Sequence, residues 1–136
     1  MGVSCEGEIG FVGYSGGETS DGTKPEEAAR FATETSIDAM AISVGNIHLQ
    51  QNKEGGLDED RIKSIEMVSD VPLVIHGGSG VPLKQRIKLA RNSKICKFNI
   101  GTELRIAFGN ALRLSVNQDI KRFDRCLLYT SPSPRD

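Results

Sequence analysis

The feature that most constrains the fold of this chain is an alternation of short apolar runs with amphipathic runs, repeated four times. Short apolar runs bounded by turn residues are typical of strands covered on both faces. A strand–helix order that repeats favours right-handed crossovers and a parallel sheet. We expect strands in four segments, at residues 3–12, 37–44, 71–75 and 95–100.

The amphipathic runs carry recognisable helix starts. Thr23 and Glu26 have the spacing of a capping box, and Asp58 is placed to cap the second helix. Pro82 and Thr102 stand where the third and fourth helices are expected to begin. Apolar residues at helical spacing predict the buried face of each helix. These residues are Ala28, Phe31 and Ala32; Ile62 and Ile65; Leu83, Ile87 and Ala90; and Leu104, Phe108, Ala111 and Leu112.

Two architectures accommodate four strand–helix units: a small doubly wound α/β sheet, or part of a (β/α)8 TIM barrel. A complete barrel takes about 200 to 250 residues. The chain has 136 residues, which hold about four units of ~30 residues each. Its length therefore suits a small doubly wound sheet or half a barrel.

Composition excludes several classes of protein. The chain has 17 basic and 18 acidic residues and a net charge of -1, so neither nucleic acid nor an anionic membrane is expected as its main partner. No apolar run approaches the ~20 residues of a membrane span, and the first residues do not form a signal peptide. Cys5, Cys96 and Cys126 form no CxxC pair, which indicates reduced thiols, with Cys96 buried in a strand. We expect a cytoplasmic protein.

The end of the chain differs from the rest. Residues 126–136 interrupt the helical pattern and contain alternating serine and proline at 131–134. We expect this segment to be a non-native or disordered tail, with a natural flexible tail as the alternative. The expected folded domain is then residues 1–125.

Chemistry-bearing residues stand at the ends of successive predicted strands. His48 and His76 are the only histidines, and each ends a strand run, while Glu8 lies in the first strand. The carboxyl ends of parallel strands meet at one edge, so these side chains are expected to gather there. Imidazole and carboxylate ligands suit zinc. The alternative is that each histidine is a hydrogen-bonded structural residue.

Two glycine-containing segments follow the last two predicted strands. Residues 77–80 read Gly-Gly-Ser-Gly, and residues 99–102 read Asn-Ile-Gly-Thr, each directly before an expected helix. Glycine allows the backbone to approach an anion closely, and paired loops of this kind hold phosphate in many barrels. A plain turn is the alternative for each segment taken alone.

Four motifs together resemble the class II aldolases, which include the zinc-dependent fructose-bisphosphate and tagatose-bisphosphate aldolases. The motifs read EGEIG at residues 6–10, VGNIH at 44–48, PLVIHGGSG at 72–80 and KFNIGTE at 97–103. The resemblance runs from about Gly2 to Asp124. It implies the C-terminal half of the family's barrel, strands five to eight.

The resemblance implies a set of site residues. His48 and His76 would be zinc ligands, and Glu8 would be a carboxylate near the metal. Lys97 would have a structural or electrostatic role, because the reaction requires no Schiff base. The segments expected to bind the phosphate and hydroxyls of a sugar-phosphate substrate are Gly77, Gly78 and Ser79, with Asn99, Ile100, Gly101 and Thr102.

The implied reaction is the reversible aldol cleavage of fructose 1,6-bisphosphate to dihydroxyacetone phosphate and glyceraldehyde 3-phosphate. Zinc is the implied cofactor. Whether a monovalent cation also binds is left open, because Leu49 stands where family members usually have glycine. The full-length protein is expected to be a homo-oligomer, a dimer or tetramer. The sequence does not distinguish specificity for fructose bisphosphate from specificity for tagatose bisphosphate.

The family's third zinc histidine and its acid/base aspartate are expected upstream of Met1, so no catalytic residue is assigned in this chain. The isolated chain is accordingly expected to be inactive. Two other functions remain open. One is a non-catalytic half barrel that binds sugar phosphates, and the other is a phosphate-binding barrel enzyme such as an isomerase or epimerase.

Overall fold

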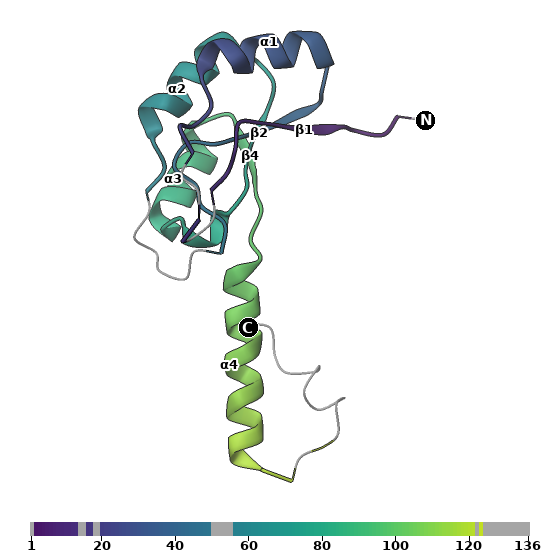
Figure 1. The fold of residues 1–136 in the computed structure, drawn as a ribbon, viewed down its shortest axis with the longest axis vertical. Coiled ribbons are helices and arrows are strands. Elements are labelled where there is room, and N and C mark those ends of the chain that lie inside the picture. Colours follow the sequence, from purple (N-terminus) through teal and green to yellow (C-terminus); the bar gives the residue numbers. More distant parts are fainter. Residues whose placement is uncertain (1, 14–15, 18–19, 50–55, 122, 124–136) are drawn as a thin grey trace. The chain divides into compact units, whose positions relative to one another are not determined.

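The computed structural model describes residues 2–13, 16–17, 20–49, 56–121 and 123. Strands and helices alternate in them as predicted, with each strand shorter than its apolar run (Figure 1). The expected tail at residues 126–136 and Cys126 lie outside the described residues. The elements are β1 (Glu6–Ile9), α1 (Pro25–Thr35), β2 (Ala39–Ile42), α2 (Glu59–Val68), β3 (Leu73–Ile75), the 3-10 helix η1 (Gly78–Gly80), α3 (Leu83–Asn92), β4 (Ile95–Phe98) and α4 (Thr102–Gln118).

The four strands form one parallel sheet in the order β1-β2-β3-β4. Glu8 lies opposite Ala41, and Ala41 lies opposite Val74 on β3. Because side chains alternate along a strand and register partners share a face, every second residue of each strand lies on the same side of the sheet. All four carboxyl ends meet at one edge, which is the arrangement that the sequence predicts for the candidate site.

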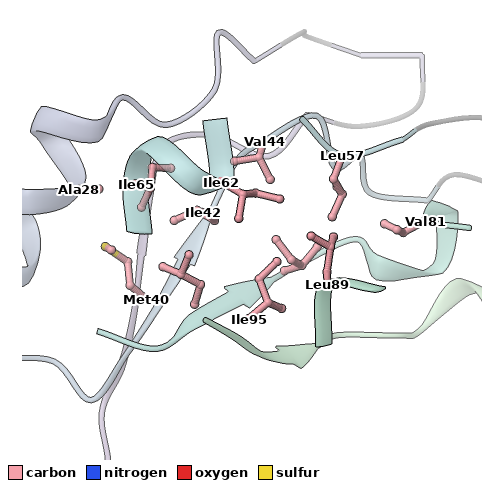
Figure 2. Packing of buried hydrophobic residues seen from close by; sticks show 12 residues of the cluster. Ala28, Met40, Ile42, Val44, Leu57, Ile62, Ile65, Val81, Leu89 and Ile95 are labelled. Atoms are coloured by element: carbon pink, nitrogen blue, oxygen red, sulfur yellow. The ribbon is translucent and has the colours of Figure 1, made fainter. Parts of the chain in front are cut away.

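The apolar core lies between one face of the sheet and the helices α1, α2 and α3 (Figure 2). Ile62 and Ile65 of α2 are buried as predicted, and Ala28 of α1 is fully buried. Burying a side chain of the size of leucine or isoleucine contributes about 1.5–3 kcal/mol. The strand residues in this core are Met40, Ile42, Leu73, Ile75 and Ile95.

The predicted capping box at Thr23 is wrong. Lys24 is the N-cap of α1, and it makes no side-chain capping bond. Thr23 is fully buried instead, where its hydroxyl donates to the carbonyl oxygen of Ile9 (2.8 Å) and accepts from the amide of Ser43 (2.8 Å). This hydroxyl satisfies backbone groups at the ends of β1 and β2, so it is not available to the helix. The second predicted cap is confirmed, because the Asp58 carboxylate accepts from the amide of Arg61 (2.9 Å).

The buried face predicted for α3 is also wrong. Leu83, Ile87 and Ala90 are exposed, whereas the buried residues of the helix are Arg86 and Leu89. The Gln85 amide side chain bonds both the N–H (2.8 Å) and the C=O (3.0 Å) of Leu57, in the segment before α2. These two bonds fix the rotation of α3 about its axis, and apolar spacing alone does not encode them.

Cys96 is exposed on β4, not buried as predicted. The pairing with β3 contains a bulge, because Leu73 lies opposite Ile95 while Val74 lies opposite Lys97. The extra residue at position 96 shifts the side-chain alternation by one. Ile95 and Phe98 therefore pack with the core, and Lys97 lies on the other face of the sheet.

The helix α4 belongs to a second compact unit, which begins at Thr102. Thr102 is its first residue, and the Thr102 hydroxyl accepts from Nη2 of Arg105 (3.1 Å). None of its described residues is buried, so the buried face predicted here, which includes Leu104 and Phe108, is not observed. Among the described residues, no helix combines the length and the apolar character that crossing a membrane requires.

Thr23→Val is expected to lower the free energy of unfolding by about 1–3 kcal/mol, because it removes the partner of the buried Ser43 amide and of the partly buried Ile9 carbonyl oxygen. Thr33→Val, on the exposed side of α1, removes a hydroxyl bonded only within its own helix and is expected to change stability by less than about 0.5 kcal/mol. Urea unfolding of both variants measures the difference. Equal losses would contradict the role of Thr23.

Candidate active site

The two histidines come together at the carboxyl edge of the sheet. His76 directly follows β3, and His48 lies in the segment after β2. Their ring centroids are 6.3 Å apart, with the ring planes inclined by 44°. The amide of His48 donates to the carbonyl oxygen of Gly13 (2.8 Å), which ties this segment to the residues that follow β1.

Two carboxylates of β1 flank the His76 ring. Oε1 of Glu6 lies 3.1 Å from Nε2, and Oε2 of Glu8 lies 3.1 Å from Nδ1. Glu6 and Glu8 lie on the face opposite the apolar core, and between them and His76 that face of β2 carries only Ala39 and Ala41. These short side chains let the glutamates reach across β2 to the histidine. Glu8 was predicted at the site, whereas Glu6 was not.

Lys97 completes a charged cluster on this face. Its ammonium group pairs with Oε2 of Glu6. The pKa of the Glu6 carboxyl is held below its usual value, chiefly by the hydrogen bond from Lys97 and further by His76, although partial burial acts in the opposite direction. Glu6 is therefore ionised at neutral pH, and Lys97 has the electrostatic contact that the resemblance implied.

The donors at this edge fit zinc in kind and nearly in spacing. Zinc–imidazole bonds are about 2.0–2.1 Å long, so two rings on one ion have centroids roughly 5–6 Å apart. The observed separation is 6.3 Å, and the carboxylate of Glu8 lies beside one of the two rings. Within the described ranges, no three His, Cys, Asp or Glu side chains already converge on one point as a metal site.

Asn46 is a site residue that the sequence analysis did not select. It is buried, and its amide nitrogen donates to the carbonyl oxygens of His76 (2.9 Å) and Ile42 (3.2 Å). Its side-chain oxygen accepts from the amide of Val44 (2.7 Å). Asn46 thereby fixes the backbone of one histidine to the segment that carries the other. The sequence signal that could have identified Asn46 is its place between Gly45 and His48, because a polar side chain there can hydrogen-bond backbone groups that lack partners.

The two glycine segments pack against each other. The amide of Gly78 donates to the carbonyl oxygen of Asn99 (3.0 Å), and the amide of Gly101 donates to the hydroxyl of Ser79 (3.2 Å). Gly77 has φ +65°, and a Cβ atom there would lie 2.6 Å from the carbonyl oxygen of Ile47. The segments after β2, β3 and β4 are therefore in contact at the carboxyl edge, where only glycine fits between them.

The remaining predicted phosphate-site residues are placed less closely. Asn99 is exposed and Ile100 is partly buried in the segment after β4. Thr102 belongs to α4 and to the second compact unit. The amide of Gly80 bonds the carbonyl oxygen of Gly77 (3.4 Å), and α3 begins only at Leu83. The amides of Gly78 and Gly80 are thus engaged within the protein, so an anion at this edge would need other donors.

The fold and this edge define a parallel α/β protein with histidines, a carboxylate and glycine loops at the carboxyl ends of its strands. A sequence model of the family described as "Fructose-bisphosphate aldolase class-II" matches residues 1–131. The chain belongs to this family.

Solved structures agree with this assignment. The YdjI aldolase from Escherichia coli K12 is 28% identical with a TM-score of 0.63, and the match covers 93% of this chain and 41% of that one. The fructose-bisphosphate aldolase (Fba) from Campylobacter jejuni is 28% identical with a TM-score of 0.58, over 88% of this chain and 37% of that one.

A third structure shows the fold alone. A Coccidioides immitis protein, provisionally assigned as a fructose-1,6-bisphosphate aldolase, is 21% identical with a TM-score of 0.72, over 93% of this chain and 46% of that one. The chain spans less than half the length of each of these three proteins.

Gly77→Ala is expected to destabilise the chain by about 1–3 kcal/mol more than Gly16→Ala. Both glycines have positive φ, at +65° and +81°, but a Cβ at Gly16 meets nothing within 4 Å. The control therefore carries the conformational cost without the clash against Ile47. Thermal unfolding of the two variants measures the difference, and equal melting temperatures would show that the segments can separate at no cost.

Proposed function

We propose that this chain is part of a zinc-dependent class II aldolase that reversibly cleaves fructose 1,6-bisphosphate to dihydroxyacetone phosphate and glyceraldehyde 3-phosphate. The observation that carries the proposal is the approach of His48 and His76 at the carboxyl edge, with Glu8 beside His76, in a chain of this family. The loops at residues 77–79 and 99–101 lie at the same edge and would contact the sugar phosphate.

The proposed architecture is half of a (β/α)8 barrel, made by residues 1–125. Four parallel strands in sequential order, with β1 and β4 at the two edges, are what one half of such a barrel contains. The coverage of only 37–46% of the similar structures supports the same proposal. We place the full-length enzyme in the cytoplasm as a homo-oligomer.

His48, His76 and Glu8 would hold the zinc ion, which supplies a Lewis acid that polarises a substrate carbonyl. Asn46 would keep the His76 backbone in place. No residue of this chain is assigned as the general acid or base. The activity of the described residues by themselves is therefore proposed to be confined to binding metal and phosphate.

A second function is a sugar-phosphate-binding half barrel without metal chemistry. It is favoured by the carboxylate oxygens that lie 3.1 Å from each His76 ring nitrogen, which is also the arrangement around a purely structural histidine. The two functions differ in what they require: the aldolase needs the histidines as metal ligands, and the binding module needs only the glycine loops.

The first experiment is a calorimetric zinc titration of the 136-residue chain, with His48→Ala, His76→Ala and Glu8→Gln variants. We expect one zinc per chain, binding lost in both histidine variants, and affinity reduced about 10-fold or more in Glu8→Gln. Glu26→Gln, an exposed glutamate of α1, is the control and should bind like the unmodified chain. Equal zinc binding by all variants, each folded by circular dichroism, would contradict the proposed site.

Dihydroxyacetone phosphate separates the two functions. The aldolase site predicts a higher melting temperature with this ligand that depends on zinc and disappears when EDTA is added. The binding module predicts the same stabilisation with and without EDTA. A thermal-shift series with the ligand, with zinc and with the chelator measures both outcomes.

A further inference from the structure

We propose that Glu6 and Lys97 are positioning residues for His76: Lys97 fixes the Glu6 carboxylate, and Glu6 holds the proton on Nε2, so that Nδ1 presents its lone pair to a metal ion. This inference rests on the proposed zinc function, in which His76 is a ligand. It assigns roles to two residues on the polar face of the sheet that lie outside the proposed ligand set.

The two carboxylates beside His76 cannot have the same role. A neutral imidazole carries one N–H donor and one acceptor nitrogen, while an ionised carboxylate can only accept. Each of Glu6 and Glu8 lies 3.1 Å from one ring nitrogen, so a neutral ring donates to one of them and faces the other with its lone pair. A cation between that lone pair and that carboxylate would satisfy both.

Three observations identify Glu6 as the acceptor of the proton. Its second oxygen pairs with Lys97, whereas Glu8 has no ion pair beyond His76 within the described ranges. The Glu6 side chain is 29% exposed and that of Glu8 40%. The positive charge of Lys97 next to Glu6 also opposes a divalent cation at Nε2.

The position of His48 points to the same side. Glu8 lies two residues closer than Glu6 to the carboxyl end of β1, and the His48 amide is bonded to Gly13, beyond that end. A metal shared by the two histidines would therefore lie on the Glu8 side of the ring, at Nδ1. A histidine ligand that donates its other N–H to a carboxylate has a fixed tautomer and is more basic, and losing the carboxylate costs roughly 10- to 100-fold in metal affinity.

The test measures the His76 tautomer directly, by the 15N chemical shifts of the ring nitrogens in the metal-free 136-residue chain at a pH where the imidazole is neutral. We expect the Nε2–H tautomer in the unmodified chain and in Glu8→Gln, and a mixture of tautomers in Glu6→Gln. Lys97→Met is expected to weaken the preference and Lys97→Arg to preserve it. Glu26→Gln, an exposed glutamate of α1, is the control and should show the same tautomer as the unmodified chain.

Zinc titration is the second readout. Glu6→Gln should bind zinc 10- to 100-fold more weakly than the unmodified chain, with Glu26→Gln again as the matched control. An unchanged tautomer and an unchanged zinc affinity in Glu6→Gln would overturn the positioning role, and zinc binding lost in both His48→Ala and His76→Ala would then leave the proposed function intact. If His76→Ala itself binds zinc normally, the proposed function fails, whereas the tautomer measured without metal still decides which carboxylate holds the proton.

Discussion

The parallel register of β1, β2 and β3 is the constraint on which the rest of the structure depends. It sorts alternate residues onto two faces, one covered by α1, α2 and α3 and the other carrying Glu6, Glu8 and His76. The same strand pairing therefore determines both the hydrogen bonds between the strands and which side chains meet at the carboxyl edge. A shift of one strand by one residue would exchange charged and apolar side chains between the faces, at a cost that few domains could offset.

The β2 strand shows how a simple sequence serves two purposes. Met40 and Ile42 pack in the apolar core, whereas Ala39 and Ala41 place only short side chains on the opposite face. Because alanine does not project far, two glutamates from one neighbouring strand contact a histidine that follows the other neighbouring strand. The small residues thus shape the site without contributing a polar group to it.

Much of this arrangement could be predicted from the sequence, because strands and helices follow local patterns of apolar residues. The order of elements, the parallel sheet and the Asp58 cap are confirmed. The predictions fail where a distant partner decides, as with Thr23, which bonds backbone groups of β1 and β2, and Gln85, which sets the rotation of α3. At the candidate site the sequence selected the histidines from their positions at strand ends. Glu6 could be assigned to the site only from the strand register. Asn46 could be assigned only with knowledge of which carbonyl oxygens lack other hydrogen-bond partners.

The bulge at Cys96 has a consequence for how this chain can vary. Position 96 is the extra residue of the bulge: its side chain is exposed, and no residue of β3 is its register partner. Many side chains could replace the cysteine, because they would not have to fit beside a register partner on β3. Had β4 paired without the bulge, with Cys96 opposite Val74, Lys97 would face the core and Phe98 would face Glu6. A β4 strand without residue 96 would pair regularly and leave Lys97 and Phe98 on their present faces, so related sequences should vary in residue type at this position and also tolerate its loss.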